Sequence, residues 1–562
     1  MKLEKVFNLT FYVYLLILLM FSIFKGITIY IHIIMTLVSL IFLTINYKKI
    51  KHDKINLILF ILPLTYIVLY LTGTYVIERR TMVQGIFETL SISLTAIVLR
   101  NTMVNKENQQ KFLTWFQVIT VISFFLSIYS YVYFDEFLKF KIFSEFGDTY
   151  VNTIDRFYGV LNYCNAQALI FMISAFITLI KKDKKIIDRA ILFISMIGFS
   201  YCFSKMIFID FIIITIILLI YNIIRKKEIE YIIFELLTIT IPVFLSISMY
   251  RYFLINENIL LFLLTNSLCF GFYLILEDYI RGKYLTIPVI LVIVITTIYT
   301  LINPILIPLT IKNVRNTKNS YVAEFMLEKG KEYDLELDYE NLQGKEQFVL
   351  KKTYVENNIL KTYDYIIFNT NKATIKTDDD TEYFLLEIRN INPKTNLTIN
   401  AVKLNGKKVN INTLIAPYQI TKQRELRKYD TESVSHRFLY YKDAIKYIKE
   451  NKYFYGRGED AFAYYRITNF DNKYNELNPH NYVLEKWLNH GILGLFYIIF
   501  IYISGIVSML RRNKNTKYTI WFIMFAGLGM FSFLDFYMSI PFIQVLFLLS
   551  YVIIVKDDYK KI

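Results

Sequence analysis

His480 and Asn481 are followed, after nine residues, by Gly491 and Gly494. An imidazole gains and loses a proton near neutral pH, so a histidine at the start of a helix is a candidate general base. Asn481 can cap that helix, Glu485 adds a polar group a little over one turn later, and the glycines permit close helix approach. The pattern fits a general-base site, but a histidine there can also be only a cap or a satisfied hydrogen-bonding residue.

Three basic residues near the ends of apolar runs are candidates for binding an anion. Arg437 opens an amphipathic segment, Lys205 stands at a tight junction between two apolar runs, and Arg156 precedes another run. A guanidinium grips phosphate oxygens in pairs and stays charged, whereas lysine acts as a point charge. Each residue also has a plainer interpretation, as a loop residue or as a side chain that reaches toward lipid headgroups.

A metal site is not expected. The nine-residue gap puts His490 roughly 15 Å along the helix from His480, so the two cannot bind one zinc ion. The three cysteines, Cys164, Cys202 and Cys269, lie in or beside apolar runs, which argues against a disulfide framework and a cysteine zinc site. We therefore expect neither a metal nor another cofactor.

The composition indicates a polytopic membrane protein. The chain has 562 residues, 55% hydrophobic content and a mean hydropathy of +0.40. Its formal charge of +16 would suggest nucleic acid for a soluble domain, but much of the excess lies in short loops between apolar runs, where it sets topology. We therefore exclude nucleic acid as a partner and take the lipid bilayer as one. The first run lacks an A-x-A cleavage site and is expected to be a retained anchor.

About fourteen apolar runs are candidate spans, some of them short. They lie near 8–24, 27–46, 55–72, 82–99, 112–134, 163–180, 190–203, 206–224, 231–249, 259–276, 284–309, 482–510, 518–534 and 540–555. A cytoplasmic amino terminus gives roughly 26 Lys and Arg inside and roughly 8 in the short outer loops. Both termini are then cytoplasmic, and residues from about 310 to 481 lie outside the cytoplasmic membrane.

The outer region divides into a strand-rich part and a helical part. Leu335 and Leu337 alternate with acidic residues, further strand-like runs follow, and Asn405-Gly406 is typical of a hairpin turn. A small β-sandwich is expected, which either binds glycan or serves as a spacer or lid. From Ser435 to Asn451 an amphipathic helix follows, with one apolar face made by Phe438, Tyr441, Ile445 and Ile448.

The expected fold is thus an all-α polytopic membrane bundle with an inserted extracytoplasmic β-domain. Four parts are expected. They are an N-terminal membrane domain of about eleven spans (1–309), the β-sandwich-like domain (310–420), an outer helix and loop (421–481) and a C-terminal membrane domain of about three spans (482–562).

The pattern His-Asn-x9-Gly-x-x-Gly resembles that of the O-antigen ligase and polymerase family, integral membrane glycosyltransferases of the GT-C type. Four other features are similar to that family. These are Arg437 with an aromatic residue before the turn Gly456-Arg457-Gly458, Ser204-Lys205 in place of Ser-Arg, the stretch from Arg156 to Asn165, and Asp535 between the last two spans. The inserted β-domain departs from the shorter outer loop that is usual there.

The resemblance implies a metal-independent, inverting transfer of glycan from undecaprenyl pyrophosphate to a hydroxyl of a glycan, lipid or protein acceptor. His480 would then be the base, and Arg437 would stabilise the pyrophosphate, with Lys205 and Arg156 as further cations. Asn165, Asn481 and Glu485 would support binding, and Asp535 would be structural or orient a cation. A flippase or a chain-length regulator is a possible partner.

Three other functions are compatible with parts of the sequence. A peptidoglycan polymerase of the shape, elongation, division and sporulation type uses similar donors, but it relies on an outer-loop aspartate. A carrier that moves lipid-linked oligosaccharide without catalysis predicts internal repeats and ionisable residues deep in spans, of which Glu88 is the main example. A glycan-sensing receptor would need fewer spans than this chain offers.

Overall fold

The computed structural model describes residues 2–555, apart from longer gaps at 138–156, 281–309, 312–320, 341–346, 390–396, 410–431, 470–477 and 512–517 and gaps of one to five residues elsewhere. The chain divides into two compact units. The first contains Met1–Ser127, Phe157–Ile232 and His436–Ile562, and the second contains Ile128–Arg156 and Ile233–Ser435.

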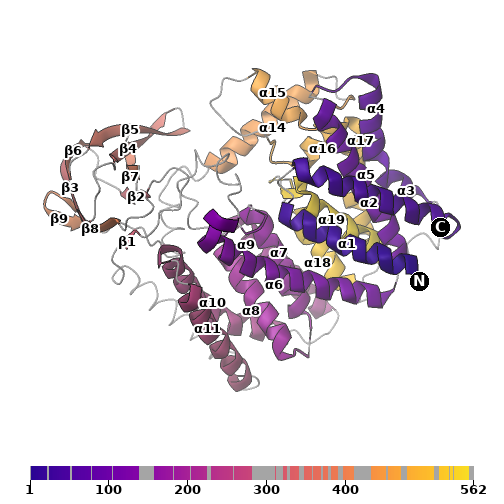
Figure 1. The fold of residues 1–562 in the computed structure, drawn as a ribbon, viewed down its shortest axis with the longest axis horizontal. Coiled ribbons are helices and arrows are strands. Elements are labelled where there is room, and N and C mark those ends of the chain that lie inside the picture. The colour runs from indigo at the N-terminus through magenta and orange to yellow at the C-terminus, as the bar shows by residue number, and fades with distance from the viewer. Residues whose placement is uncertain are drawn as a thin grey trace. The chain divides into compact units, whose positions relative to one another are not determined.

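The first unit is helical (Figure 1), and two of its helices extend into the second unit, one after Ser127 and one before His436. Its amino-terminal helices are α1 (Lys2–Phe21), α2 (Lys25–Ile45), α3 (Lys54–Leu59), α4 (Ile61–Thr72), α5 (Arg79–Thr102) and α6 (Lys106–Phe137), followed by α7 (Cys164–Leu179), α8 (Ile186–Tyr201) and α9 (Lys205–Ile224). Its carboxyl-terminal helices are α14 (Glu432–Glu450), α15 (Ala461–Asn469), α16 (Tyr482–His490), α17 (Ile492–Arg511), α18 (Thr519–Met530) and α19 (Pro541–Val555). Segments distant in sequence pack together, since α19 contacts α5 and α18 contacts α7.

Six of the described helices are long and apolar enough to cross a membrane. Their apolar stretches are Leu3–Phe21, Thr28–Ile45, Arg79–Thr102, Lys106–Tyr129, Ile259–Glu277 and Ile492–Arg511, and six shorter apolar helices accompany them. These helices confirm the expectation of a helical membrane protein. The total of about fourteen spans stays a prediction, and the span expected at 284–309 lies outside the described residues.

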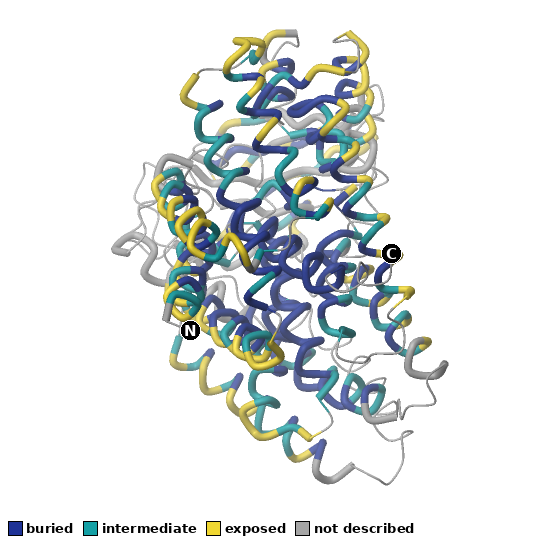
Figure 2. Tube along the Cα trace, turned by 90° about the vertical axis from the view of Figure 1, so that its right-hand side faces the viewer, coloured by how far each residue is buried: buried dark blue, intermediate teal, exposed yellow. Residues whose placement is uncertain are grey.

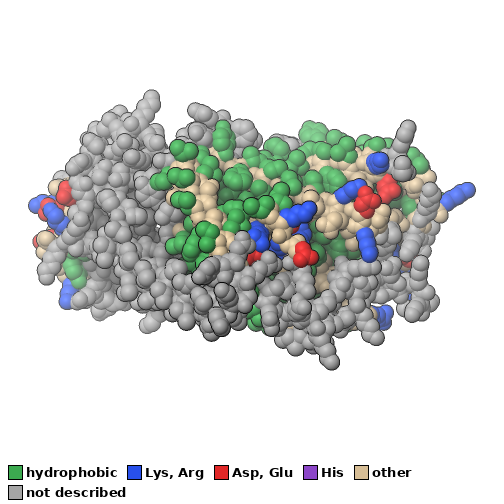
Figure 3. Space-filling model, turned by 90° about the horizontal axis from the view of Figure 1, so that it is seen from below, with side chains coloured by type: hydrophobic (Ala, Val, Ile, Leu, Met, Phe, Trp, Pro, Cys, Tyr) green, Lys and Arg blue, Asp and Glu red, His purple; other side chains and the backbone are tan. Residues whose placement is uncertain are grey.

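Exposed aliphatic side chains follow helical spacing on the outer helices. In α1, Val6, Leu9 and Val13 are exposed while Phe7 and Phe11 are buried. A helix that is apolar on its exposed side as well as its buried side is typical of a membrane span, because lipid replaces water around it. Figure 3 shows hydrophobic side chains covering a broad area of one face, with few charged groups among them.

The most enclosed helices are α7 and α19. Every residue of α19 is buried, and in α7 only Asn165 is not. Figure 2 shows long buried stretches where helices pack on one another. Polar side chains in this interior bond across helices, as when Gln117 Nε2 donates to Thr178 Oγ1 at 2.7 Å. Such pairing is required because no water is present there to satisfy a buried polar group.

The second unit contains α10 (Glu230–Asn256, of which the first three residues belong to the first unit), α11 (Ile259–Ile280) and two antiparallel sheets (Figure 1). One sheet has the order β1-β8-β3-β6, with β9 paired to β8, and the other has the order β2-β7-β4-β5. The strands are β1 (Thr310–Ile311), β2 (Tyr321–Phe325), β3 (Glu332–Glu340), β4 (Gln347–Glu356), β5 (Ile359–Phe368), β6 (Lys372–Lys376), β7 (Thr381–Arg389), β8 (Leu397–Leu404) and β9 (Lys407–Val409).

The strand pattern read from the sequence matches this region. Leu335 and Leu337 of β3 are buried, and the acidic residues between and beside them are exposed or half-buried. Asn405 and Gly406 both have positive φ, at 51° and 75°, and join β8 to β9. Asparagine and glycine tolerate that conformation, so they favour the tight hairpin predicted from their sequence.

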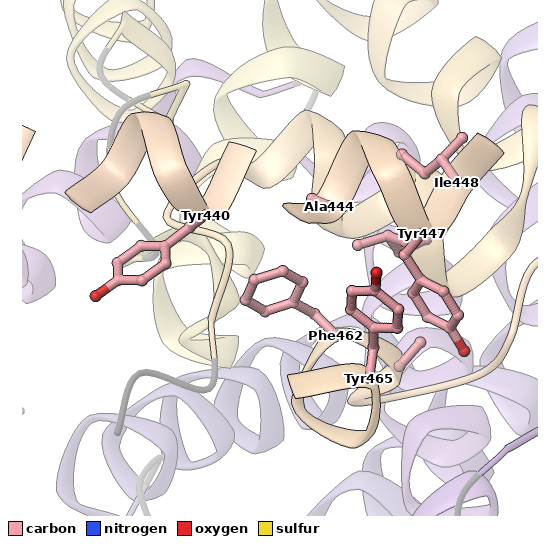
Figure 4. Close-up of a cluster of buried hydrophobic side chains, with 8 residues drawn as sticks. Tyr440, Ala444, Tyr447, Ile448, Phe462 and Tyr465 are labelled. Carbon is pink, nitrogen blue, oxygen red and sulfur yellow. The ribbon is translucent and has the colours of Figure 1, made fainter. Parts of the chain in front are cut away.

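Helix α14 forms where it was expected, but it packs with a different face. Its buried side carries Tyr440, Ala444, Tyr447 and Ile448, whereas Phe438 is 64% exposed. Figure 4 shows these buried side chains meeting Phe462 and Tyr465 of α15. Ala444 lets the helices approach, and the tyrosine rings offer a large area for packing. Of the apolar face expected to lie along the membrane surface or against the bundle, Ile448 is buried here, whereas Phe438 and Ile445 are exposed.

We predict that Tyr447→Ala weakens the packing of α14 on α15. The Tyr447 ring stacks on Tyr465 with centroids 4.2 Å apart. Its removal is expected to cost about 3 kcal/mol of unfolding free energy, because burial and stacking are both lost. Fluorescence of Trp487, which packs against this cluster, reports the transition in detergent. Phe438→Ala, on the exposed side of the same helix, is the control, and equal destabilisation by both variants would contradict the packing described.

Candidate functional site

The nine residues between His480-Asn481 and Gly491 are a single short helix, α16. The single span expected at 482–510 is therefore wrong, because the chain turns at Gly491 and continues as α17. Its two ends have unusual backbone conformations, with φ of 49° at His480 and 70° at Gly491. Glycine adopts positive φ without strain, whereas histidine does so only where its surroundings fix it. The nine residues between Asn481 and Gly491 are therefore the length of α16, and the chain turns sharply at His480 and at Gly491.

Asn481 fixes the amino-terminal end of α16. Its Oδ1 accepts from Leu484 N at 3.0 Å, which confirms the predicted cap, and its Nδ2 donates to Phe533 O at 2.9 Å. Tyr441 of α14 donates from its hydroxyl to His480 O at 3.1 Å and to Phe533 O at 2.9 Å. Two segments distant in sequence, α14 and the residues at Phe533, thus hold the chain at His480 and Asn481 in place.

Asp535 is the centre of a polar cluster beside His480. Its fully buried carboxylate accepts from Tyr163 Oη at 2.5 Å and from Asn165 Nδ2 at 2.6 Å. His480 Nδ1 lies 3.4 Å from Asp535 Oδ1. Ser204, which caps α9, donates to Asn165 Oδ1 at 2.7 Å and extends the cluster to a further helix.

The environment of Asp535 keeps its carboxylate ionised. Burial alone would raise its pKa, but the hydrogen bond with His480 and the positive charge of Arg437 lower it below the ordinary value of 3.8. The Tyr163 hydrogen bond acts in the same direction. A fixed negative charge on the Nδ1 side of His480 orients the ring and stabilises its protonated form.

Arg437 lies in the second turn of α14 and is half-buried. Its Nη1 approaches Met206 Sδ at 3.9 Å, which places the guanidinium near the start of α9. Lys205 is the first residue of α9, but its side chain lies outside the described residues, as does the whole of Arg156. The structure therefore brings Arg437, Asn165, His480, Asn481 and Asp535 together.

The Gly456-Arg457-Gly458 turn caps the other end of α16. Arg457 N donates to Leu488 O at 2.9 Å, and Gly458 N donates to Asn489 O at 3.1 Å. A Cβ on Gly456 would lie 2.4 Å from Asn489 O, so only glycine fits there. The Gly456-Arg457-Gly458 turn and the end of α16 are thus packed backbone to backbone. A Cβ on Gly491 or on Gly494 would likewise meet a backbone oxygen.

Glu485 is occupied by neighbours within the fold. It accepts hydrogen bonds from Ser539 and, at 3.3 Å, from Lys486 Nζ. Glu485 and Lys486 are both buried. Its predicted role in substrate binding stays a prediction, while its observed contacts tie α16 to the segment before α19. Among the described residues, no three His, Cys, Asp or Glu side chains lie close enough to hold a metal ion.

Four residues of the cluster were not selected as site residues from the sequence. They are Tyr163, Ser204, Tyr440 and Tyr441, the last two on α14. Tyr440 stacks on the His480 ring with centroids 5.8 Å apart. Tyr163 and Ser204 could have been selected because they lie beside Asn165 and Lys205 in the sequence. A tyrosine near a membrane surface is, however, too common for its residue type alone to indicate a site.

The fold and this cluster define a helical membrane protein whose polar site is assembled where apolar helices begin and end. Residues 397–499 match the family model of the O-antigen ligase, and this match supports an O-antigen ligase family assignment for the chain. The matched segment runs from β8 into α17 and contains Arg437, both glycine turns and His480. No curated protein and no solved structure matches the chain.

We predict that Gly456→Ala lowers the stability of the folded protein by about 2 kcal/mol or more, because the added Cβ meets a backbone oxygen that cannot move freely. The thermal midpoint of the purified protein in detergent measures this. Gly271→Ala is the control, since nothing lies within 4 Å of a Cβ there and alanine favours a helix. Equal midpoints for the two variants would show that the turn is not tightly packed.

We also predict how the stability contributed by Asp535 varies with pH. Its pKa is lower in the folded protein than in the unfolded chain, so its stabilisation is complete above the unfolded value near 3.8 and is lost as pH falls below it. The difference in unfolding free energy between wild type and Asp535→Asn is therefore expected to shrink as pH falls below about 4. A difference that did not shrink below about pH 4 would contradict an ionised Asp535.

Proposed function

We propose that the protein is a glycosyltransferase that moves a glycan from undecaprenyl pyrophosphate to a hydroxyl of an acceptor at the outer face of the cytoplasmic membrane. The observation that carries this proposal is the pairing of His480 with the buried carboxylate of Asp535, beside Arg437. The O-antigen ligase match over residues 397–499 supports a lipid-linked glycan as the substrate class. Ligase and polymerase chemistry would use the same groups.

His480 acts as the general base in this proposal. Its Nδ1 faces Asp535, so Nε2 is the atom that takes the proton from the acceptor hydroxyl. The acceptor oxygen forms a bond to the anomeric carbon as the bond from that carbon to the phosphate oxygen breaks. Undecaprenyl pyrophosphate leaves with the bonding electrons, and attack from the opposite side inverts the anomeric centre. Asp535 stabilises the imidazolium that forms.

Arg437 stabilises the leaving pyrophosphate. Negative charge builds on the phosphate oxygens as the sugar departs, and a fixed guanidinium beside the site offsets that charge without a metal ion. The described position of Arg437, near the start of α9, puts it close to Lys205 in the chain fold. Lys205 and Arg156 are proposed as further cations, and Asn165 as a residue that positions Asp535.

The proposed topology places this site outside the cytoplasm. The excess of Lys and Arg in alternate loops supports cytoplasmic termini, about fourteen spans in a GT-C-like bundle, and an extracytoplasmic region from about 310 to 481. The strands of 310–409 belong to that outer region in this proposal, as a sandwich-like insertion. A flippase or a chain-length regulator is proposed as a partner.

The test is transfer of labelled glycan from its polyprenyl pyrophosphate carrier by purified protein. We expect His480→Ala to lower transfer by at least about a thousandfold while donor still binds, because only proton removal is lost. We expect Arg437→Ala to lower transfer by about a hundredfold, because the leaving group loses a charge partner.

Lys442→Ala is the matched control for Arg437, since it removes a positive charge from an exposed position of the same helix. It is expected to leave transfer unchanged. If transfer survives both the His480 and Arg437 substitutions, the residue roles are wrong. If wild type moves glycan across the membrane but makes no product, the protein is a carrier.

A further inference from the structure

A second surface of the first unit combines aromatic rings with polar groups. We define it as the tyrosine platform, formed by Tyr70 at the end of α4, Tyr75 in the loop that follows, and Arg79 at the start of α5. The two tyrosine rings stack nearly parallel, with centroids 6.1 Å apart and an angle of 8°. Arg79 Nε donates to Tyr70 Oη at 2.7 Å, and the guanidinium lies over the same ring at 5.3 Å.

The tyrosine platform is attached to the turn that caps α16. Val76 N donates to Arg457 O at 3.0 Å, and a Cβ on Gly458 would lie 3.1 Å from Tyr75 Cβ. Arg457 in turn donates to Leu488 O near the end of α16. Leu488 follows Asn481 by seven residues, roughly 10 Å along α16. The platform is thus attached near the carboxyl-terminal end of α16, and His480 precedes its amino-terminal end.

Exposed polar groups lie on the same segment as the platform. The hydroxyls of Thr72 and Thr74 bond to each other at 2.9 Å at exposed positions, and Arg79 is exposed. A sugar ring has flat faces of C–H groups that pack on an aromatic ring, while its hydroxyls need donors and acceptors at the edges. Half-exposed rings surrounded by hydroxyl and guanidinium groups provide both.

Tyr70 lies on a different side of α4 from the exposed aliphatic residues. Its exposed aliphatic stripe is made by Leu64, Val68 and Leu71, at 51%, 50% and 76% exposure. At 100° per residue, Tyr70 stands roughly 130° around the helix from the middle of that stripe. Tyr70 instead packs beside Tyr66 and Met82 within the protein. A ring serving only as a membrane anchor would be expected on the same side as the aliphatic stripe.

We infer that the tyrosine platform binds saccharide units of the glycan beyond the unit that reacts at His480. The inference rests on the proposed function for the identity of the glycan, and it adds a binding site about one helix length from the reacting centre. Tyr70 is covered by Tyr75 and Arg79, so the Tyr75 ring holds a sugar by packing, and Arg79 with the threonine hydroxyls bonds to sugar hydroxyls or to acidic groups of the chain.

The test measures glycan binding apart from transfer. The probe is the free oligosaccharide released by mild acid from the polyprenyl-linked pool of the cells that make the protein. It is titrated by calorimetry against full-length protein in detergent, in the His480→Ala background so that no product forms. Tyr75→Ala keeps the Cβ that packs on Gly458, so the fold is expected to persist. We expect its Kd to rise about tenfold.

Leu71→Ala is the matched control, because it shortens an exposed side chain on the lipid-facing stripe next to Tyr70. Its Kd is expected to equal that of the parent protein. An unchanged Kd for Tyr75→Ala overturns the inference, and so does a parent protein that binds no glycan. If binding depends on Tyr75 but no variant or wild type transfers glycan, the platform stands and the proposed transfer fails.

A second measurement distinguishes glycan from lipid. Tyr75→Trp and Leu71→Trp are reconstituted in vesicles of brominated phosphatidylcholine, which quenches tryptophan in contact with acyl chains. We expect strong quenching at position 71 and weak quenching at position 75, with added oligosaccharide changing only the emission at 75. Equal quenching at both positions would make the platform part of the membrane interface and overturn the inference.

Discussion

The buried carboxylate of Asp535 is the interaction on which the polar site depends. It takes hydrogen bonds from Tyr163 and Asn165 at the start of α7 and lies against His480 before α16. A buried charge is tolerated only when several donors surround it, and each of those donors is then fixed in place by the charge. The carboxylate therefore joins helices that are far apart in sequence and sets the direction of the His480 ring.

The short helix α16 carries this arrangement to the rest of the unit. Its amino-terminal end is held by Asn481 and by Tyr441 of α14, and its carboxyl-terminal end by the Gly456-Arg457-Gly458 turn. Hydrogen bonds therefore hold both ends of this helix. The helix thus connects the proposed base to the tyrosine platform, and the glycines of the motif are needed for backbone contact as much as for flexibility.

The apolar surroundings explain why so many polar side chains of the site bond to one another. Spans such as α1 expose aliphatic residues, and α19 is buried throughout, so polar groups among the helices cannot rely on water. Under the proposed function, the same groups at the helix ends would meet both a lipid-linked donor and its acceptor.

The sequence by itself determined the membrane class, the start of the helix at Asn481, and the hairpin at Asn405-Gly406, whereas the end of that helix at Gly491 came from the structure. Each depends on hydropathy, capping or turn preference, which act between residues close together in the chain. Only the tertiary structure decided that Asp535 pairs with His480 across 55 residues, that Tyr163 joins them, and which face of α14 is buried. Those outcomes depend on how helices pack, because the buried area and the available hydrogen-bond partners are set by neighbours that local sequence does not specify.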